Sequence, residues 1–219
     1  MTAQPAAGRT IAVVSAGLGQ PSSTRLLADR LAAAATAALR DLGADTEVVT
    51  VELRDHARQM VDATLTGFTA GALRDAVETV TGADGLVAVT PVFNASFSGL
   101  FKMFFDLLER GSLEGVPVLI GATGGTARHS LVLEHAVRPM FAYMRAVAAP
   151  TAVYAASEDW GSAGAGGADG LTERVARAGG ELASLVAARP PARDRRGAGD
   201  ADPYEDPVPF ERLLASGGQ

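Results

Sequence analysis

The sequence predicts an α/β fold built on a parallel sheet with helices on both faces. Short apolar segments alternate along the chain with longer segments whose apolar residues recur at helical spacing. Strands that are apolar along their whole length are typical of parallel sheets, which helices cover on both sides. The chain has 219 residues, of which 47% are hydrophobic, so one domain with a large core is expected.

Five segments are predicted as strands because they are short, apolar and bounded by turn-forming residues. The third is expected to end at Thr90-Pro91, since proline has no backbone N–H to pair. The five segments are 11–15, 46–53, 85–89, 116–121 and 151–154.

Helices are predicted between these strands. The first is expected to begin near Ser23 and to end before Gly43, because glycine commonly terminates helices. Residues 54–68 are less regular, and only a short helix around 57–60 is expected there. The remaining helices are expected over 70–81, 98–110, 129–148 (with a bend near Pro139) and 171–188.

The chain is expected to divide into one domain and a tail. Residues 1–188 contain all the predicted strands and helices. Residues 189–219 are rich in proline, glycine and charged residues, a composition that predicts a segment disordered or packed on a partner.

Composition excludes several classes of function. The chain has no cysteine, which excludes disulfides, thiolate nucleophiles and cysteine-bound metals. Its net charge of −6 and lack of a basic block argue against nucleic-acid binding. With no membrane-spanning apolar run and no secretory signal pattern, a cytoplasmic protein without a membrane partner is expected. No metal-ligand motif or acid–base constellation occurs, so neither a metal site nor a catalytic side chain is predicted.

The loop after the first predicted strand has the chemistry of an anion site. Residues 15–25 read SAGLGQPSSTR and lead into a helix. Free N–H groups and the helix dipole at a helix start stabilise an anion, and the hydroxyls of this loop add hydrogen bonds. Helix capping by Ser22 or Ser23 is the simpler alternative, but it needs only one hydroxyl. The loop is therefore predicted to bind a phosphate.

A dinucleotide-binding Rossmann site is an alternative that stays open. Gly17 and Gly19 begin the pattern G-x-G-x-x-G, but Ser22 occupies the third glycine position. Glu52, at the end of the second predicted strand, stands where such sites place a ribose-binding acid. The G-x-x-x-x-G-K-[ST] motif of P-loop nucleotide-binding proteins is absent.

Two further loops follow the third and fourth predicted strands. They read TPVFNAS over 90–96 and ATGGT over 122–126. Gly124 and Gly125 permit positive φ and a close approach of the backbone to a flat ligand, although a tight turn would also explain them. Because the carboxyl ends of parallel strands meet at one edge of the sheet, the three loops predict a single ligand site there.

Together these loops resemble those of the NADPH-dependent FMN reductase family, whose members have a flavodoxin-like fold. The resemblance covers about residues 9–188. Its most specific part is PVFNAS over 91–96, followed by Gly99, Leu100, Phe101, Lys102 and Asp106, which is similar to the family pattern P-x-[YF]-N-x-S…G-x-[LF]-K-x-x-x-D. RHSL over 128–131 is similar to the sulfonate-pathway branch. The resemblance implies a five-stranded parallel sheet in the order 2-1-3-4-5.

The resemblance also implies which residues bind FMN. Phe93 departs from the tyrosine that the family often has, and therefore offers no phenol hydrogen bond. The implied phosphate site is Ser22, Ser23 and Thr24, with Ser15, Gln20 and Arg25 nearby; Pro91, Val92, Phe93, Asn94 and Ala95 border the isoalloxazine and ribityl chain; and Thr123, Gly124 and Gly125 face the pyrimidine edge.

The implied function is that of an NAD(P)H-dependent FMN reductase, a flavoprotein oxidoreductase that uses FMN and either NADPH or NADH. A partner flavin-dependent monooxygenase that receives the reduced flavin is one implied role. Alternatives are a quinone, azo or chromate reductase, a flavodoxin-like electron carrier and a flavin-free binding protein. The resemblance also implies a homodimer or homotetramer, and the apolar residues of the helices at 98–110 and 129–148 agree with that expectation.

Two questions about the site stay open in the sequence. Arg25, Arg128 and Arg138 are all candidates for binding the 2′-phosphate of NADPH, and nothing ranks them. Trp160 follows the last predicted strand, so it is expected either to stack near the cofactor and line the site or to pack within its own loop.

Overall fold

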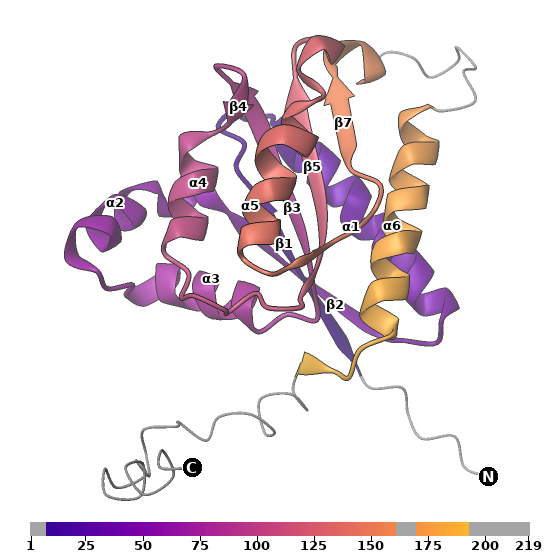
Figure 1. Ribbon diagram of the computed structural model, residues 1–219, viewed down its shortest axis with the longest axis horizontal. Helices are drawn as coiled ribbons and strands as arrows, with labels where there is room; N and C mark the ends of the chain where they lie inside the picture. The colour runs from indigo at the N-terminus through magenta and orange to yellow at the C-terminus, as the bar shows by residue number, and fades with distance from the viewer. Residues whose placement is uncertain (1–7, 161–169, 193–219) are drawn as a thin grey trace, which may run out of the picture.

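A central, mainly parallel sheet separates two layers of helices (Figure 1). A computed structural model describes residues 8–160 and 170–192. Each strand of the main sheet runs in the same direction as its neighbour, which confirms the predicted parallel α/β class. The strands are β1 (Arg9–Ser15), β2 (Thr46–Glu52), β3 (Gly85–Phe93), β4 (Ser96–Phe97), β5 (Pro117–Gly124), β6 (Val147–Ala148) and β7 (Val153–Ala156).

The strand order confirms the order implied by the family resemblance. β2, β1, β3 and β5 lie side by side, and both β6 and β7 pair with β5. The short β4 forms a hairpin with the end of β3. Ser15 pairs with both Glu52 and Val89, and Val89 pairs with Gly121, so the carboxyl ends of the central strands lie at one edge. We call this edge the rim.

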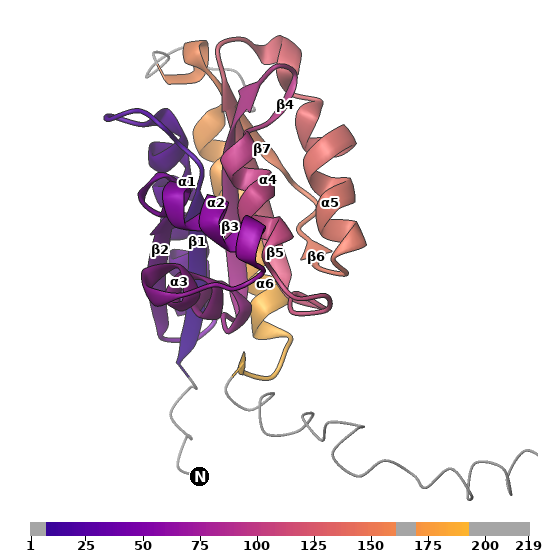
Figure 2. The same cartoon turned by 90° about the vertical axis from the view of Figure 1, so that its left-hand side faces the viewer.

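The helices fall into two layers, one on each face of the sheet (Figure 2). Each layer packs a separate apolar core. On one face, Leu27 and Leu31 of the first helix pack with Leu182 of the last one. On the other face, Phe101 and Phe141 join a cluster of aromatic and aliphatic side chains. The helices are α1 (Ser23–Asp41), η1 (Leu53–His56), α2 (Ala57–Thr66), α3 (Gly71–Thr81), α4 (Gly99–Asp106), η2 (Ala127–His129), η3 (Leu133–Val137), α5 (Arg138–Tyr143), η4 (Ser157–Trp160) and α6 (Leu171–Ala187).

The prediction that the third strand ends at Thr90-Pro91 is wrong. β3 continues through Pro91 to Phe93 and pairs with both β5 and β4. Val89 accepts a hydrogen bond from Ala16, the residue after the end of β1. Because residues two apart face the same side of a strand, the nitrogen of Pro91 points to the side that β1 has already left. Its missing N–H therefore breaks no bond of the sheet.

The single helix predicted over 129–148 is also wrong. The chain forms η2, the π-helical turn η3 and the short α5, and then the strand β6. Arg145 has a φ of 59°, which ends the helical path before β6. The apolar periodicity of this segment reflects its burial, but the hydrogen-bonding pattern changes within it.

Smaller differences concern the ends of elements. Residues 53–66 are more helical than predicted, because η1 leads directly into α2. The helix predicted over 98–110 ends at Asp106, and β5 extends past the predicted strand into the predicted loop as far as Gly124. The last strand, β7, starts two residues later than predicted.

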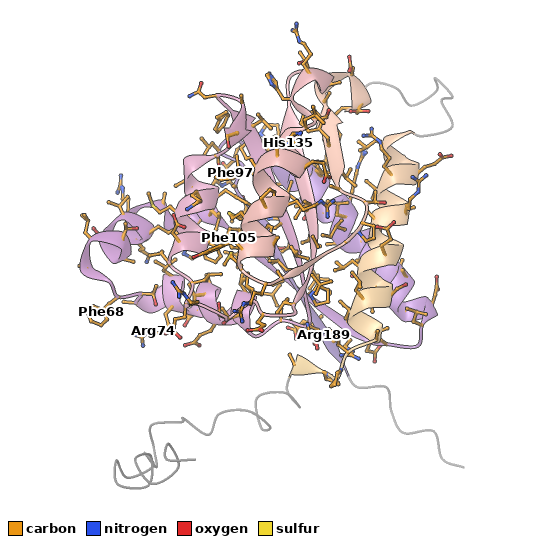
Figure 3. All side chains as sticks on the ribbon, in the orientation of Figure 1. Phe68, Arg74, Phe97, Phe105, His135 and Arg189 are labelled. Atoms are coloured by element: carbon orange, nitrogen blue, oxygen red, sulfur yellow. The ribbon has the colours of Figure 1, made fainter. Side chains whose placement is uncertain are left out.

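The first residues of the predicted tail are held on the domain. Asp84 is buried, and its carboxylate accepts hydrogen bonds from the backbone N–H of Thr10 (2.9 Å) and of Ala192 (2.6 Å). Arg9 pairs with Asp84 and donates to the carbonyl of Arg189, which lies at the edge opposite the rim (Figure 3). The rest of the predicted tail, 193–219, lies outside the described residues, and its prediction stays a prediction.

Candidate functional site

A pocket of about 420 Å³ lies at the rim, where the three loops singled out by the sequence meet. This volume is within the range of roughly 300–1,000 Å³ that is usual for small-molecule sites. We call it the rim pocket. It is lined by Leu18, Gly19, Pro21, Ser22, Ser23 and Thr24 from the first loop, by Pro91, Val92 and Phe93 from β3, by Thr123, Gly124 and Gly125 from the end of β5, and by Ser157 and Trp160 from η4.

The start of α1 offers donors to this pocket. Ser22 caps the helix: its side-chain oxygen accepts from the N–H of Arg25, and its carbonyl accepts from the N–H of Leu26. The first N–H groups of a helix have no partner within it, so those of Ser23 and Thr24 remain as donors beside the pocket. An anion here would also gain from the helix dipole.

Gly17 makes room for this cap. A Cβ atom built on Gly17 would lie 2.0 Å from the side-chain oxygen of Ser22, closer than real contacts allow. The glycine that looked like the beginning of a dinucleotide motif therefore serves the serine at the helix start. Glu52, the ribose-binding candidate of that alternative, is engaged by both Arg25 and Arg54. These contacts count against the Rossmann alternative.

A hydroxyl contact joins the first loop to β5. The side-chain oxygens of Thr24 and Thr123 lie 2.8 Å apart, and both residues are buried. The contact fixes the start of α1 against the end of β5. The hydroxyl of Thr24 is thereby shared with Thr123, while the side chain of Ser23 is exposed and free to meet a ligand.

The opposite wall comes from the end of β3 and its tight hairpin. Val92 pairs with Phe97 and Phe93 with Ser96, which leaves Asn94 and Ala95 as a two-residue turn. Both turn residues have positive φ, 49° and 64°. Their side chains do not line the pocket, whereas Phe93 does, with 46% of its side chain exposed.

Gly124 is needed for a reason that the sequence did not reveal. A Cβ on Gly124 would lie 2.1 Å from the hydroxyl of Tyr154, which donates to the carbonyl of Thr126. Burial, followed by the nearby Asp159, raises the pKa of Tyr154, so the phenol stays protonated and keeps this bond. Neither Gly124 nor Gly125 has a positive φ, contrary to the conformational freedom expected of them.

Three of the predicted phosphate-site residues do not line the pocket. Ser15 is fully buried, and its hydroxyl has no hydrogen-bond partner within residues 8–160 and 170–192. Gln20 and Arg25 are absent from the lining. Arg25 donates to Asp29 and Glu52, and its pKa is raised, chiefly by the bond to Asp29, so it stays charged.

Sequence reasoning missed some lining residues. Leu18, Pro21 and Ser157 were not singled out, and Gly19 was considered only as part of a dinucleotide motif, although all four follow strands that end at the rim. Trp160 lines the pocket and also packs against the neighbouring core, and the guanidinium of Arg30 lies 5.0 Å from its ring centre. This cation–π contact connects η4 to α1.

Two larger hollows lie elsewhere on the domain. One of about 670 Å³ surrounds Asp84 at the edge opposite the rim, and one of about 1,000 Å³ runs between α4 and α5. Neither combines a helix start and clustered hydroxyls with the ends of several parallel strands. The rim pocket is therefore the candidate site despite its smaller volume.

The residues of the rim pocket fit FMN. Free helix N–H groups and the hydroxyl of Ser23 suit a phosphate, and the orphaned hydroxyl of Ser15 adds a buried polar group behind them. A Cβ on Gly125 would meet no atom within 4 Å, so that wall is open to a flat ring. The apolar side chains of Val92, Phe93 and Trp160 suit the faces of an aromatic system.

The described part of the chain contains neither a membrane-spanning helix nor a cluster of metal ligands. None of its helices is long and apolar enough to cross a bilayer. Residues 8–160 and 170–192 also contain no group of three or more histidine, cysteine or acidic side chains arranged to hold a metal.

Comparison with known proteins agrees with this geometry. The family profile described as NADPH-dependent FMN reductase matches residues 9–161. A Pseudomonas aeruginosa protein named FMN reductase (NADPH) is 38% identical over 151 residues, which are 68% of this chain and 78% of that protein. A Pseudomonas fluorescens protein named NADH-dependent FMN reductase SfnF is 35% identical over 150 residues, again 68% and 78%. The two named relatives differ in the nicotinamide donor.

Solved structures show the same fold. An oxidoreductase from Corynebacterium diphtheriae is 48% identical, with a TM-score of 0.78 over 84% of this chain and 99% of that one. The apo form of an NADH:FMN oxidoreductase, EmoB, is 23% identical, with a TM-score of 0.70 over 86% of this chain and 98% of that one. At that identity the second comparison supports the fold alone.

Proposed function

The chain belongs to the NADPH-dependent FMN reductase family, and we propose that this NAD(P)H-dependent flavin oxidoreductase binds its FMN in the rim pocket. The observation that carries the proposal is the convergence of three loops, remote in sequence, on one hollow that combines helix-start donors with apolar walls. Bound FMN supplies the chemistry that takes a hydride from NAD(P)H and passes electrons on.

The start of α1 is the proposed phosphate site. Ser22 keeps the helix start in shape, and Ser23 and Thr24 present their N–H groups to the phosphate. None of the lining side chains that the structure describes carries a charge, so the binding energy is expected to come from oriented dipoles and hydrogen bonds. Arg25 contributes a positive field from behind the loop, weakened by its two carboxylate partners.

The walls beyond the phosphate site are proposed to hold the flavin ring. Pro91, Val92 and Phe93 form one wall, and Thr123 to Gly125 form the other. Main-chain groups at these strand ends are fixed by the sheet before a ligand arrives, which lowers the cost of ordering the site. Asn94 and Ala95 are proposed to act by shaping the hairpin rather than through their side chains.

The structure supports a ranking of the three arginine candidates for the NADPH phosphate. Arg25 is paired with Asp29 and Glu52, and Arg138 is bound to Glu134 and to the carbonyls of Ala149 and Pro150. Arg128 is exposed, and within the described ranges no hydrogen bond or ion pair engages it. Arg128 lies three residues after Gly125, so we propose it as the group that meets the 2′-phosphate.

The acceptor of the electrons is proposed to be a flavin-dependent monooxygenase that takes up the reduced flavin. Leu18, Ser23, Phe93 and Gly125 are all exposed at the pocket. Because this side of the pocket is open, FMN can dissociate from it without the unfolding of any helix or strand. We also propose that the protein acts in the cytoplasm, where reduced nicotinamides are available.

A second copy of the chain is the proposed partner of the α4–α5 face. Phe97 and Phe105 line the groove there (Figure 3). Met140 and Tyr143 line it as well, and Tyr143 is 81% exposed. Lys102, Asp106, Glu114 and Arg145 give the same face charges of both signs. Such a surface can pair with its own symmetry mate, so a homodimer, or a tetramer built from it, is proposed.

A steady-state assay of NADPH and NADH oxidation, with and without added FMN, tests the proposed function. We expect oxidation that depends on FMN and saturates with it. Gly125→Trp should abolish this activity by filling the pocket while leaving the fold intact, because no atom lies near its Cβ. Absence of oxidation with either donor and with any quinone, azo or chromate acceptor would leave only a carrier or a binding protein.

A further inference from the structure

Arg54 contacts the first loop of the rim pocket without lining the pocket itself. It lies in η1, directly after β2, and 20% of its side chain is exposed. Its Nη1 donates to the carbonyl oxygen of Gly19 at 2.8 Å. In the amide orientation that satisfies both side chains, Gln20 accepts a second bond from Nη2 of Arg54 at 2.9 Å.

Glu52 connects Arg54 to the start of α1. Its Oε2 lies 2.8 Å from Nη2 of Arg54, and its Oε1 accepts from Nη1 of Arg25 at 2.6 Å. Arg25 belongs to the first turn of α1, and its N–H is bound by the capping oxygen of Ser22. Residues 19–25 are therefore held at both ends by one chain of charged contacts.

The opposite side of the same loop faces the ligand. Gly19, Pro21 and Ser22 line the rim pocket, whereas Arg54, Glu52 and Gln20 do not. We propose that Arg54 is a positioning residue that fixes the backbone of residues 19–22, so that the donors at the start of α1 are in place for the phosphate of FMN. The inference rests on the proposed site for FMN.

The loop needs such a support because little else holds it. Gly19 and Gln20 are exposed, and Leu18 has 54% of its side chain exposed, so the core does not anchor this stretch. A loop that orders only upon binding spends part of the interaction energy on that ordering. The planar guanidinium of Arg54 binds several acceptors in fixed directions at once, which a lysine ammonium does not reproduce.

Direct contact between Arg54 and the phosphate is the less favoured reading. Glu52 at 2.8 Å, with Asp55 at 3.6 Å, balances the positive charge of Arg54. A phosphate that reached Arg54 would have to compete with Glu52 and displace the bond to Gly19. These contacts assign the side chain of Arg54 to the loop and not to the ligand.

Comparison of FMN with riboflavin tests the inference, because riboflavin is the same flavin without the phosphate. Flavin fluorescence titration of the flavin-stripped full chain gives both dissociation constants. For Arg54→Met we expect the FMN constant to rise about tenfold and the riboflavin constant to stay unchanged, the size of one or two lost hydrogen bonds. Arg54→Lys should lose a similar factor, because it keeps the charge without the fork. Arg54→Lys also keeps the test possible if Arg54→Met does not fold.

The matched control is Arg58→Met, which removes an exposed arginine one helical turn further along without touching the loop. It should leave both constants unchanged. The role of Arg54 would be overturned if Arg54→Met kept the wild-type preference for FMN over riboflavin, or if it weakened the binding of both flavins equally. It would also be overturned if Arg54→Lys bound both flavins as the wild type does. Equal affinity of the wild-type chain for the two flavins would instead contradict the phosphate site itself, and would remove the basis of the inference.

Discussion

Ser22 and Ser23 are neighbours with different tasks. The oxygen of Ser22 is used within the protein, where it caps α1 in space that Gly17 leaves free. The side chain of Ser23 is exposed at the pocket. Ser23 is thus the residue at which a charge can be introduced beside the proposed phosphate without removing the cap.

Ser23→Asp is expected to weaken FMN binding by at least about tenfold, because a carboxylate repels the phosphate at short range. The fold should not suffer, since an acidic residue in the first turn of a helix is favourable. Fluorescence titration with FMN and riboflavin measures the effect, which should be confined to FMN. Ser184→Asp on α6 adds the same charge at an exposed site outside the pocket and should change neither constant. Unchanged FMN affinity in Ser23→Asp would contradict the phosphate site.

Arg128 is the residue on which donor preference should depend. For Arg128→Ala we expect kcat/KM for NADPH to fall about five- to tenfold, the loss of one charge-assisted contact at an exposed site, with NADH nearly unaffected. Steady-state kinetics with both donors measure the ratio. Arg74→Ala on α3 removes an exposed arginine elsewhere and should preserve it. A ratio that Arg128→Ala leaves unchanged would exclude this residue from donor recognition.

At the scale of elements, β5 and β7 pack together because the side chain of Tyr154 fills space that the absent side chain of Gly124 leaves free. The hydroxyl of Tyr154 occupies the space where a Cβ of Gly124 would be. Gly124→Ala should therefore lower the free energy of unfolding by about 1–3 kcal/mol through overpacking. Urea denaturation measures the change. Gly125→Ala, whose Cβ meets no atom, should stay within about 0.5 kcal/mol of the wild type. Similar losses in both variants would contradict the packing account.

The β3–β4 hairpin stores strain at Ala95. Its φ of 64° is unfavourable for any residue with a Cβ, and two-residue hairpins of this kind prefer Asn-Gly over the Asn-Ala found here. Ala95→Gly should raise the free energy of unfolding by about 0.5–1 kcal/mol, after allowing for the greater freedom of glycine in the unfolded chain. The same substitution at the exposed helical Ala37 of α1 should lower it by about 1 kcal/mol. Changes of the same sign at both positions would refute the strain.

Sequence patterns located these elements because periodicity and turn residues are local signals. They failed where a tertiary contact decided the outcome. Pro91 looked like the end of a strand, but the departure of β1 removes the penalty for its missing N–H. The apolar residues of 129–148 looked like one helix, yet the chain changes from a π-helical turn to α5 and then enters β6.

At the scale of the whole molecule, the sheet register explains why the pocket was predictable. Ser15, Val89 and Gly121 lie in one row, so the loops that follow their strands had to meet. The partners behind the pocket were not predictable, because the contacts of Arg54 with Gly19 and of Tyr154 with Thr126 join distant residues without a motif. The sequence also did not indicate that Ser15, Gln20 and Arg25 would be absent from the lining of the pocket, because a spacing does not say which way a side chain points.

The proposed dimer gives a prediction at this scale. Tyr143 and Phe68 are almost equally exposed, at 81% and 80%, but only Tyr143 borders the α4–α5 groove. Tyr143→Lys should shift the protein from dimer to monomer at micromolar concentration, because burying the charge of a lysine in an apolar contact is costly. Phe68→Lys should leave the dimer intact. Light scattering measures the molar mass of each variant in solution. A monomeric wild type, or a dimer that Phe68→Lys dissociates and Tyr143→Lys does not, would contradict this interface.

The most direct measurement of the central claim is a crystal structure of the protein with FMN bound. The phosphate should lie at the start of α1, within hydrogen-bond distance of the N–H groups of Ser23 and Thr24. The flavin ring should lie between Pro91–Phe93 and Thr123–Gly125. FMN found in the hollow between α4 and α5, or a rim pocket closed by its own side chains at saturating FMN, would contradict the account.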